Sequence, residues 1–99
     1  MFGELEIFLK EIDSSNKSFE RKHFEKLIIT VYYLGGRHGQ SAKFEDVKNK
    51  INMTNKQSIR TLEDVVKKGY IEIKNTTGEK IEELLLTQTG RRYVENLLD

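Results

Sequence analysis

The side chains best suited to binding chemistry gather in one short stretch, MTNKQSIRTLEDVVKK, residues 53–68. On a helical wheel, Ile59, Leu62 and Val66 share one side, with Val65 at its edge, and this side is predicted to pack inward. The opposite side is predicted to face outward and carries Lys56, Gln57, Arg60, Thr61, Asp64, Lys67 and Lys68. Lysine and arginine neutralise phosphates, while arginine, glutamine and asparagine can hydrogen-bond to base edges in a major groove. The stretch therefore favours recognition of nucleic acid.

Catalysis and metal binding find little support in the remaining polar residues. His23 and His38 lie far apart, without an HExxH pattern or a cysteine partner. Acidic pairs such as Glu45 and Asp46 are adjacent in sequence, so on a helix their side chains diverge instead of sharing a proton. The glycine-rich segment GGRHGQSAK lacks the GxxxxGK[ST] pattern of a phosphate-binding loop. We expect no enzymatic activity, no cofactor and no metal.

Length and composition set further limits. The 99 residues suffice for one small domain with one core, and the net charge of +1 indicates no partner by itself. Lysine and arginine outnumber acids in residues 43–62, whereas acids dominate residues 1–20. The absence of cysteine favours an intracellular, cytoplasmic protein. Recognition of nucleic acid by residues 53–68 would associate it with the nucleoid. Glutamates within the apolar pattern of the N-terminal segment argue against a signal peptide or a membrane span.

Periodicity predicts the helices that must position this stretch. Apolar residues at helical spacing indicate helices over about residues 3–13 and 19–34, the second ended by GGRHGQ. A third, short helix is predicted within SAKFEDVKNKINM. Thr54 and Gln57 have the spacing of a capping box, which predicts a fourth helix starting directly after a tight turn. Two short helices that abut in this way form a helix-turn-helix.

A β-hairpin and a last helix are predicted to follow. Gly69 ends the fourth helix, YIEIKN alternates as a strand does, and KIEELLLT returns beyond the turn NTTGEK. TQTGRRYVENLLD predicts a helix capped at Thr87. The fold class is thus mainly α with a small β-hairpin. We expect a single domain over residues 1–99, with an N-terminal helix in 1–13, a core over 19–86 and a C-terminal helix over 87–99.

Two stretches resemble winged helix-turn-helix DNA-binding domains, and among them the small MarR-like and PadR-like bacterial and archaeal regulators. FEDVKNKINMTNKQSIRTLEDVVKKGYIEI is similar to the family's run of helix, turn, recognition helix and exit into the wing. LLLTQTGRRYVENLL is similar to the Leu-Thr-x-x-Gly-Arg segment that ends the wing and starts the last helix. The resemblance covers about residues 19–98. It implies a winged helix-turn-helix fold with extra N- and C-terminal helices.

The resemblance also implies a recognition helix over about residues 54–68 in the major groove and a wing near residues 75–80. Carried over by position, the candidates for reading bases are Asn55, Lys56, Gln57, Arg60 and Thr61. The candidates for contacting the DNA backbone are Lys43, Lys48, Lys50, Lys67, Lys74 and Lys80. One departure concerns the wing, because MarR-type wings commonly carry an Asp-x-Arg pair that NTTGEKIEE lacks.

Dimerisation through terminal helices is usual among the regulators that this chain resembles. The candidate residues are Leu5, Phe8, Leu9, Ile12, Tyr93, Leu97 and Leu98, although the same apolar residues could instead cap the core of a monomer. The expected function is sequence-specific binding of double-stranded DNA by a homodimeric, repressor-like transcriptional regulator that occupies an operator. Two alternatives stay open: a DNA-packaging or plasmid-segregation protein that binds adjacent sites, and a winged helix that assembles with proteins and does not bind DNA. A small-molecule effector is left open.

Overall fold

A computed structural model of the protein describes residues 3–78 and 80–99. The elements in chain order are α1 (Glu4–Asp13), α2 (Phe19–Leu34), the 3-10 helix η1 (Gly36–His38), β1 (Ala42–Lys43), α3 (Phe44–Ile51), α4 (Asn55–Lys67), β2 (Ile71–Thr77), β3 (Lys80–Leu86) and α5 (Gln88–Leu98). The predicted order of four helices, a hairpin and a last helix is confirmed. The sequence did not predict η1 or β1.

Helix α2 is the centre of the core. Its first turn is capped by Ser18, whose hydroxyl accepts from the backbone N–H of Arg21. Leu27, Ile28 and Val31 along α2 have no exposed surface, and α1, α3, α4 and α5 all pack against this helix. Because one helix contacts every other helix, its apolar residues hold the whole arrangement together.

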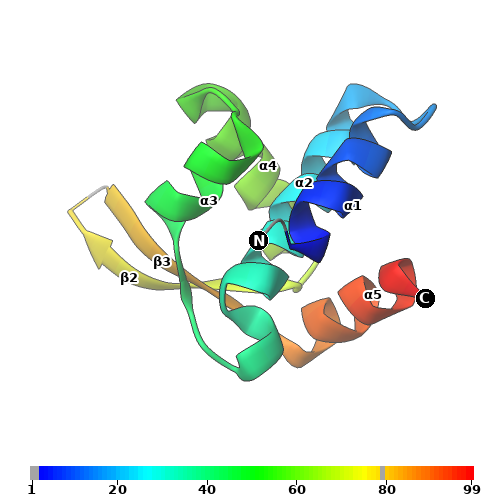
Figure 1. Ribbon diagram of the computed structural model, residues 1–99. Coiled ribbons are helices and arrows are strands. Elements are labelled where there is room, and N and C mark those ends of the chain that lie inside the picture. Colours follow the sequence, from blue (N-terminus) through cyan, green and yellow to red (C-terminus); the bar gives the residue numbers. More distant parts are fainter. Residues whose placement is uncertain (1–2, 79) are drawn as a thin grey trace.

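A small antiparallel sheet lies at the edge of the helices. Strands β2 and β3 form the predicted hairpin, and β1 adds to the other side of β3, giving the order β1-β3-β2. The register of β2 against β3 shifts around Asn75, which marks a bulge near the tip. The hairpin extends away from the helices as a wing, at the left of Figure 1.

The turn between α3 and α4 is as tight as the sequence predicts. Asn52 takes a left-handed conformation, with φ of 53°, and donates its backbone N–H to the carbonyl of Lys48. The capping box is confirmed: Thr54 Oγ1 accepts from the N–H of Gln57 at 3.1 Å, and Gln57 Oε1 accepts from the N–H of Thr54 at 3.2 Å. These two hydrogen bonds satisfy backbone donors that a helix start leaves without partners, so α4 begins at a defined residue.

The buried side of α4 differs from the one predicted. Its buried residues are Ser58, Thr61, Leu62 and Val65, whereas Ile59 is 40% exposed and Val66 is half-buried. A helical wheel predicts the buried side from apolar side chains alone. In α4 the small hydroxyl residues Ser58 and Thr61 also face inward. Ser58 can be buried without an unpaired donor because its hydroxyl donates to the carbonyl of Thr54 at 2.9 Å. The inward side of α4 is therefore rotated away from Ile59.

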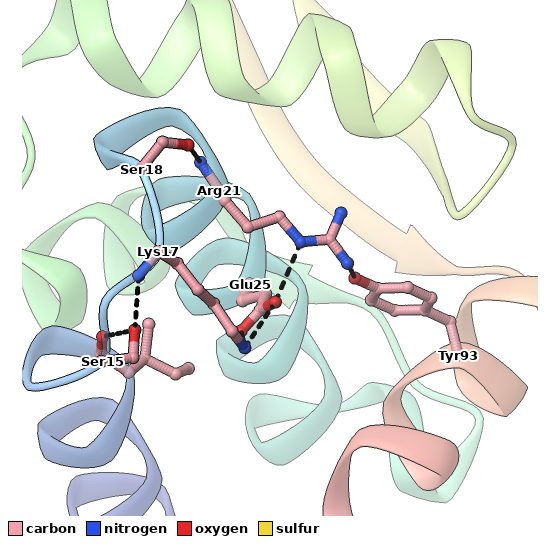
Figure 2. A network of polar contacts seen from close by, with 7 residues as sticks. Ser15, Lys17, Ser18, Arg21, Glu25 and Tyr93 are labelled. Carbon is pink, nitrogen blue, oxygen red and sulfur yellow. Dashed lines mark hydrogen bonds and ion pairs between the residues drawn. The ribbon is translucent and has the colours of Figure 1, made fainter.

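A polar and aromatic network joins α2 to α5, as Figure 2 shows. Glu25 is only 2% exposed and accepts from Lys17 Nζ at 2.7 and 2.9 Å and from Arg21 Nε at 3.0 Å. Arg21 also donates to the hydroxyl of Tyr93 on α5. The ring of Tyr93 stacks on that of Tyr70, just before β2, with centroids 4.7 Å apart. The network thereby links three elements that are distant in sequence.

Candidate nucleic-acid interface

Helices α3 and α4 form a helix-turn-helix, and α4 presents a row of exposed polar side chains. Asn55, Lys56, Gln57 and Arg60 are all exposed on its first two turns, as predicted. Among the described residues, neither Lys56 nor Arg60 has a recorded ion pair with a carboxylate. Two cations close together on a capped helix start can neutralise phosphates or donate to base edges without first breaking an internal salt bridge.

The two amide side chains of this row are partly committed within the protein. Gln57 uses its carbonyl oxygen in the capping box, and Asn55 Oδ1 accepts from Lys48 Nζ at 3.0 Å. Each amide NH2 group is a separate donor that these hydrogen bonds do not use. Both side chains therefore offer donors from fixed positions.

Thr61 requires a correction. It was predicted to read bases from the outward face, but the structure buries it to 7% exposure on the side of α4 that faces α2. The rotation of the buried side described above explains the difference, since Thr61 and Ser58 lie one turn apart. We therefore leave Thr61 out of the interface. No apolar pattern around Thr61 predicts its burial.

The lysines predicted to contact phosphates fall into two groups. Lys43, Lys67 and Lys74 are exposed. The others lie beside carboxylates: Lys48 pairs with Glu45 at 3.2 Å, Lys80 with Glu82 at 3.9 Å, and Lys50 with Glu6 of α1. The Glu6–Lys50 pair joins α1 to α3. A phosphate contact by Lys50 would compete with this pair.

Glu83 of β3 is partly withdrawn from the surface of the wing. Glu83 is half-buried and accepts hydrogen bonds from the hydroxyl of Ser41 and from the amide of Asn75. These bonds, the one from Ser41 first, lower the pKa of Glu83 below its usual value of 4.5. The two hydrogen bonds therefore favour the ionised carboxylate and fix it between Ser41, which precedes β1, and Asn75 of β2.

A hollow of about 490 Å³ lies between the start of α2 and α4. Phe19 and His23 line it from α2, and Lys56, Arg60 and Asp64 line it from α4. The ring of Phe19 is 75% exposed. Burial, with the nearby ammonium of Lys26, lowers the pKa of His23 below its ordinary 6.5. The sequence did not single out Phe19, because a phenylalanine at a helix start is ordinarily part of the core.

The described residues lack the features of a metal site and of a membrane span. In residues 3–78 and 80–99, no group of three or more histidine, cysteine, aspartate or glutamate side chains could hold a metal ion. Within the same residues, no helix is both long enough and apolar enough to cross a membrane.

The terminal helices give a mixed result for the predicted dimer surface. Leu5 and Ile12 are buried within the chain itself, so the structure does not leave them free for a second copy. The remaining candidates are half-buried and pack against the core: Phe8, Leu9, Tyr93, Leu97 and Leu98. Phe8, Leu97 and Leu98 line a small hollow of about 140 Å³ that also reaches Glu25. Both terminal helices lie on the side away from the wing (Figure 1).

No protein-family model matches the chain, and no curated protein is similar enough in sequence to count as a relative. Two solved structures share its fold. A MarR family regulator from Neisseria meningitidis superposes with a TM-score of 0.66 at 17% identity, over 94% of this chain and 61% of its own. Streptococcus pneumoniae FabT in complex with DNA superposes with a TM-score of 0.57 at 20% identity, over 94% and 62%.

These similarities define the class of fold. The helix-turn-helix of α3 and α4, the wing of β2 and β3 and the flanking helices together are a winged helix-turn-helix of the kind found in MarR regulators. The chain spans about three fifths of the length of either neighbour.

Proposed function

We propose that this protein binds double-stranded DNA sequence-specifically and regulates transcription by occupying an operator. The observation that carries the proposal is the pair Lys56 and Arg60, exposed on the first two turns of a capped helix and without recorded ion pairs among the described residues. An arginine placed there can make a bidentate contact with guanine, and a lysine can reach guanine or a phosphate. The protein acts by binding and catalyses no reaction.

The fold neighbours support this proposal. One is a MarR family regulator, and the other was solved in complex with DNA. In this chain, Asn55, Lys56, Gln57 and Arg60 contact base edges, and Lys43, Lys67 and Lys74 contact the backbone. Lys48, Lys50 and Lys80 contribute less affinity, because a phosphate must displace the carboxylates of Glu45, Glu6 and Glu82.

We further propose that the protein acts as a homodimer formed by α1 and α5. The half-buried residues Phe8, Leu9, Leu97 and Leu98 supply apolar surface on the side away from the wing. A two-fold dimer places two copies of α4 about 34 Å apart, one helical turn of DNA, so the binding site is a pseudo-palindrome.

Selection from a random-sequence duplex library tests both proposals. The wild-type protein is expected to enrich one motif with two inverted half-sites whose centres are about 10 base pairs apart. Enrichment of a single half-site with a monomeric complex in sedimentation would contradict the dimer. No enrichment, even at low salt, would contradict DNA recognition.

The ion pairs at Lys48, Lys50 and Lys80 favour one rival, a winged helix that binds proteins, because they reduce the free positive charge on α3 and on the wing. The same selection distinguishes the two, since a protein-assembly module enriches no motif. Cooperative coating of long DNA without a motif would instead identify a packaging or segregation protein.

A further inference from the structure

Ile59 is an apolar side chain placed on the polar side of α4. It is 40% exposed and lies outside the core cluster of the described residues. Its neighbours on the helix surface are Asn55, Lys56, Arg60 and Glu63, and together these five residues line a shallow hollow of about 440 Å³. A single exposed isoleucine is ordinary on a protein surface. Here its position is informative, because it lines the same hollow as Lys56 and Arg60, the two cations that carry the proposed function.

The chemistry of the major groove provides a partner for such a side chain. Base edges in this groove present hydrogen-bond donors and acceptors, and the C5-methyl group of thymine is the apolar group among them. We infer that Ile59 packs against a thymine methyl group and so selects thymine at one position of the binding site. This inference rests on the proposed function, and it adds a specificity that the cations cannot supply.

Two properties of Ile59 suit this role. Its β-branched side chain has one strongly preferred rotamer in a helix, so its methyl groups are already fixed before DNA arrives. Its helix is held by the capping box at one end and by the buried Ser58 and Leu62 on either side of Ile59 in sequence. A rigid apolar surface loses little conformational entropy on contact. More of the free energy of a weak apolar contact therefore remains as binding affinity.

The expected effect is modest and measurable. Burying one methyl group is worth about 0.8 kcal/mol, which corresponds to about fourfold in affinity. Replacing thymine by uracil removes only this methyl group and keeps the Watson–Crick edge. The comparison therefore isolates the contact that Ile59 is proposed to make.

The test is a double-mutant cycle on a duplex selected by the wild-type protein, made once with thymine and once with uracil at the same positions. Wild type is expected to bind the uracil duplex about fourfold more weakly for each half-site in which the methyl group is removed. Ile59→Ala is expected to bind the thymine duplex as weakly as wild type binds the uracil duplex, and to show no further loss with uracil. Ile59→Val, which keeps both branches at Cβ and loses only the Cδ1 methyl group, is expected to fall between them.

Ile7→Ala is the matched control, because Ile7 is also an exposed isoleucine, 56% exposed, but lies on α1. This variant is expected to lose affinity on the uracil duplex by the same factor as wild type. Circular dichroism of each variant checks that the fold is retained. If wild type binds both duplexes equally, or if Ile59→Ala keeps the full sensitivity to uracil, the inference is overturned while DNA binding stands. If no duplex is enriched at all, both the inference and the proposed function fail.

Discussion

Gly90 lies directly against the backbone carbonyl of Tyr70. A Cβ atom at Gly90 would be 2.9 Å from the carbonyl carbon of Tyr70 and closer still to its oxygen. The contact joins the first turn of α5 to the segment between α4 and β2. Thr87 strengthens the same junction, because its hydroxyl accepts from the N–H of Gly90 at 3.0 Å and donates to the carbonyl of Gly69 at 2.7 Å. This junction explains why threonine and glycine stand three residues apart.

Gly90→Ala is expected to destabilise the protein by about 3 kcal/mol or more, because backbone atoms of Tyr70 cannot move aside cheaply. Chemical denaturation followed by circular dichroism measures the loss. Gly3→Ala is the matched control, since an added Cβ there meets its nearest atom at an ordinary 3.6 Å. Equal stability of the two variants would contradict the close contact.

Local signals in the sequence were sufficient to predict most elements. The capping box of Thr54 and Gln57, the end of α2 at the glycines, the hairpin and the Thr87 cap each depend on residues within a few positions of one another. Such short-range patterns act before any tertiary contact forms.

Long-range packing decided what the sequence could not predict. The buried side of α4 is set by contact with α2, so Ser58 and Thr61 face inward and Ile59 does not. The pair of Glu6 with Lys50 joins residues far apart in the chain, and no local pattern indicates it. These long-range contacts decide which predicted site residues are available to a partner.

The buried carboxylate of Glu25 should make its cations essential. Lys17→Met/Arg21→Met leaves the carboxyl group of Glu25, a residue only 2% exposed, without its cationic partners, and is expected to lose about 3–5 kcal/mol of unfolding free energy. Glu25→Gln alone should cost less, about 1–2 kcal/mol, because the half-exposed cations can turn to water.

Combining the three substitutions gives the decisive comparison for this network. Glu25→Gln added to Lys17→Met/Arg21→Met is expected to restore stability, because the charge that lacked a partner has been removed. Urea unfolding of all variants measures the coupling. A triple variant no more stable than the double variant would contradict the claim that the buried carboxyl group of Glu25 depends on Lys17 and Arg21.

Acid should weaken the wing through Glu83. Hydrogen bonds from Ser41 and Asn75 lower the pKa of this carboxyl below 4.5, so its ionised form stabilises the folded state. The contribution is complete above about pH 4.5, the value for an unperturbed glutamate, and is lost as the pH falls through the lower, folded-state pKa. Glu83→Gln is expected to flatten the decline in unfolding free energy below pH 4.5.

The control for this pH dependence is Glu72→Gln, which removes an exposed carboxylate from β2. That variant should retain the acid sensitivity of wild type. Identical pH profiles for wild type and Glu83→Gln would show that the two hydrogen bonds contribute nothing to stability.

The central claim, DNA binding by the outward side of α4, is tested most directly by fluorescence anisotropy of a labelled random-sequence duplex at about 50 and 200 mM salt. Wild type is compared with Lys56→Ala/Arg60→Ala and with Lys10→Ala/Arg92→Ala, which removes equal charge from exposed positions on α1 and α5. Wild type and the control pair are expected to bind and to weaken steeply with salt, while Lys56→Ala/Arg60→Ala binds more weakly with a smaller salt dependence. Equal binding by all three proteins, or no binding at low salt, would contradict the claim.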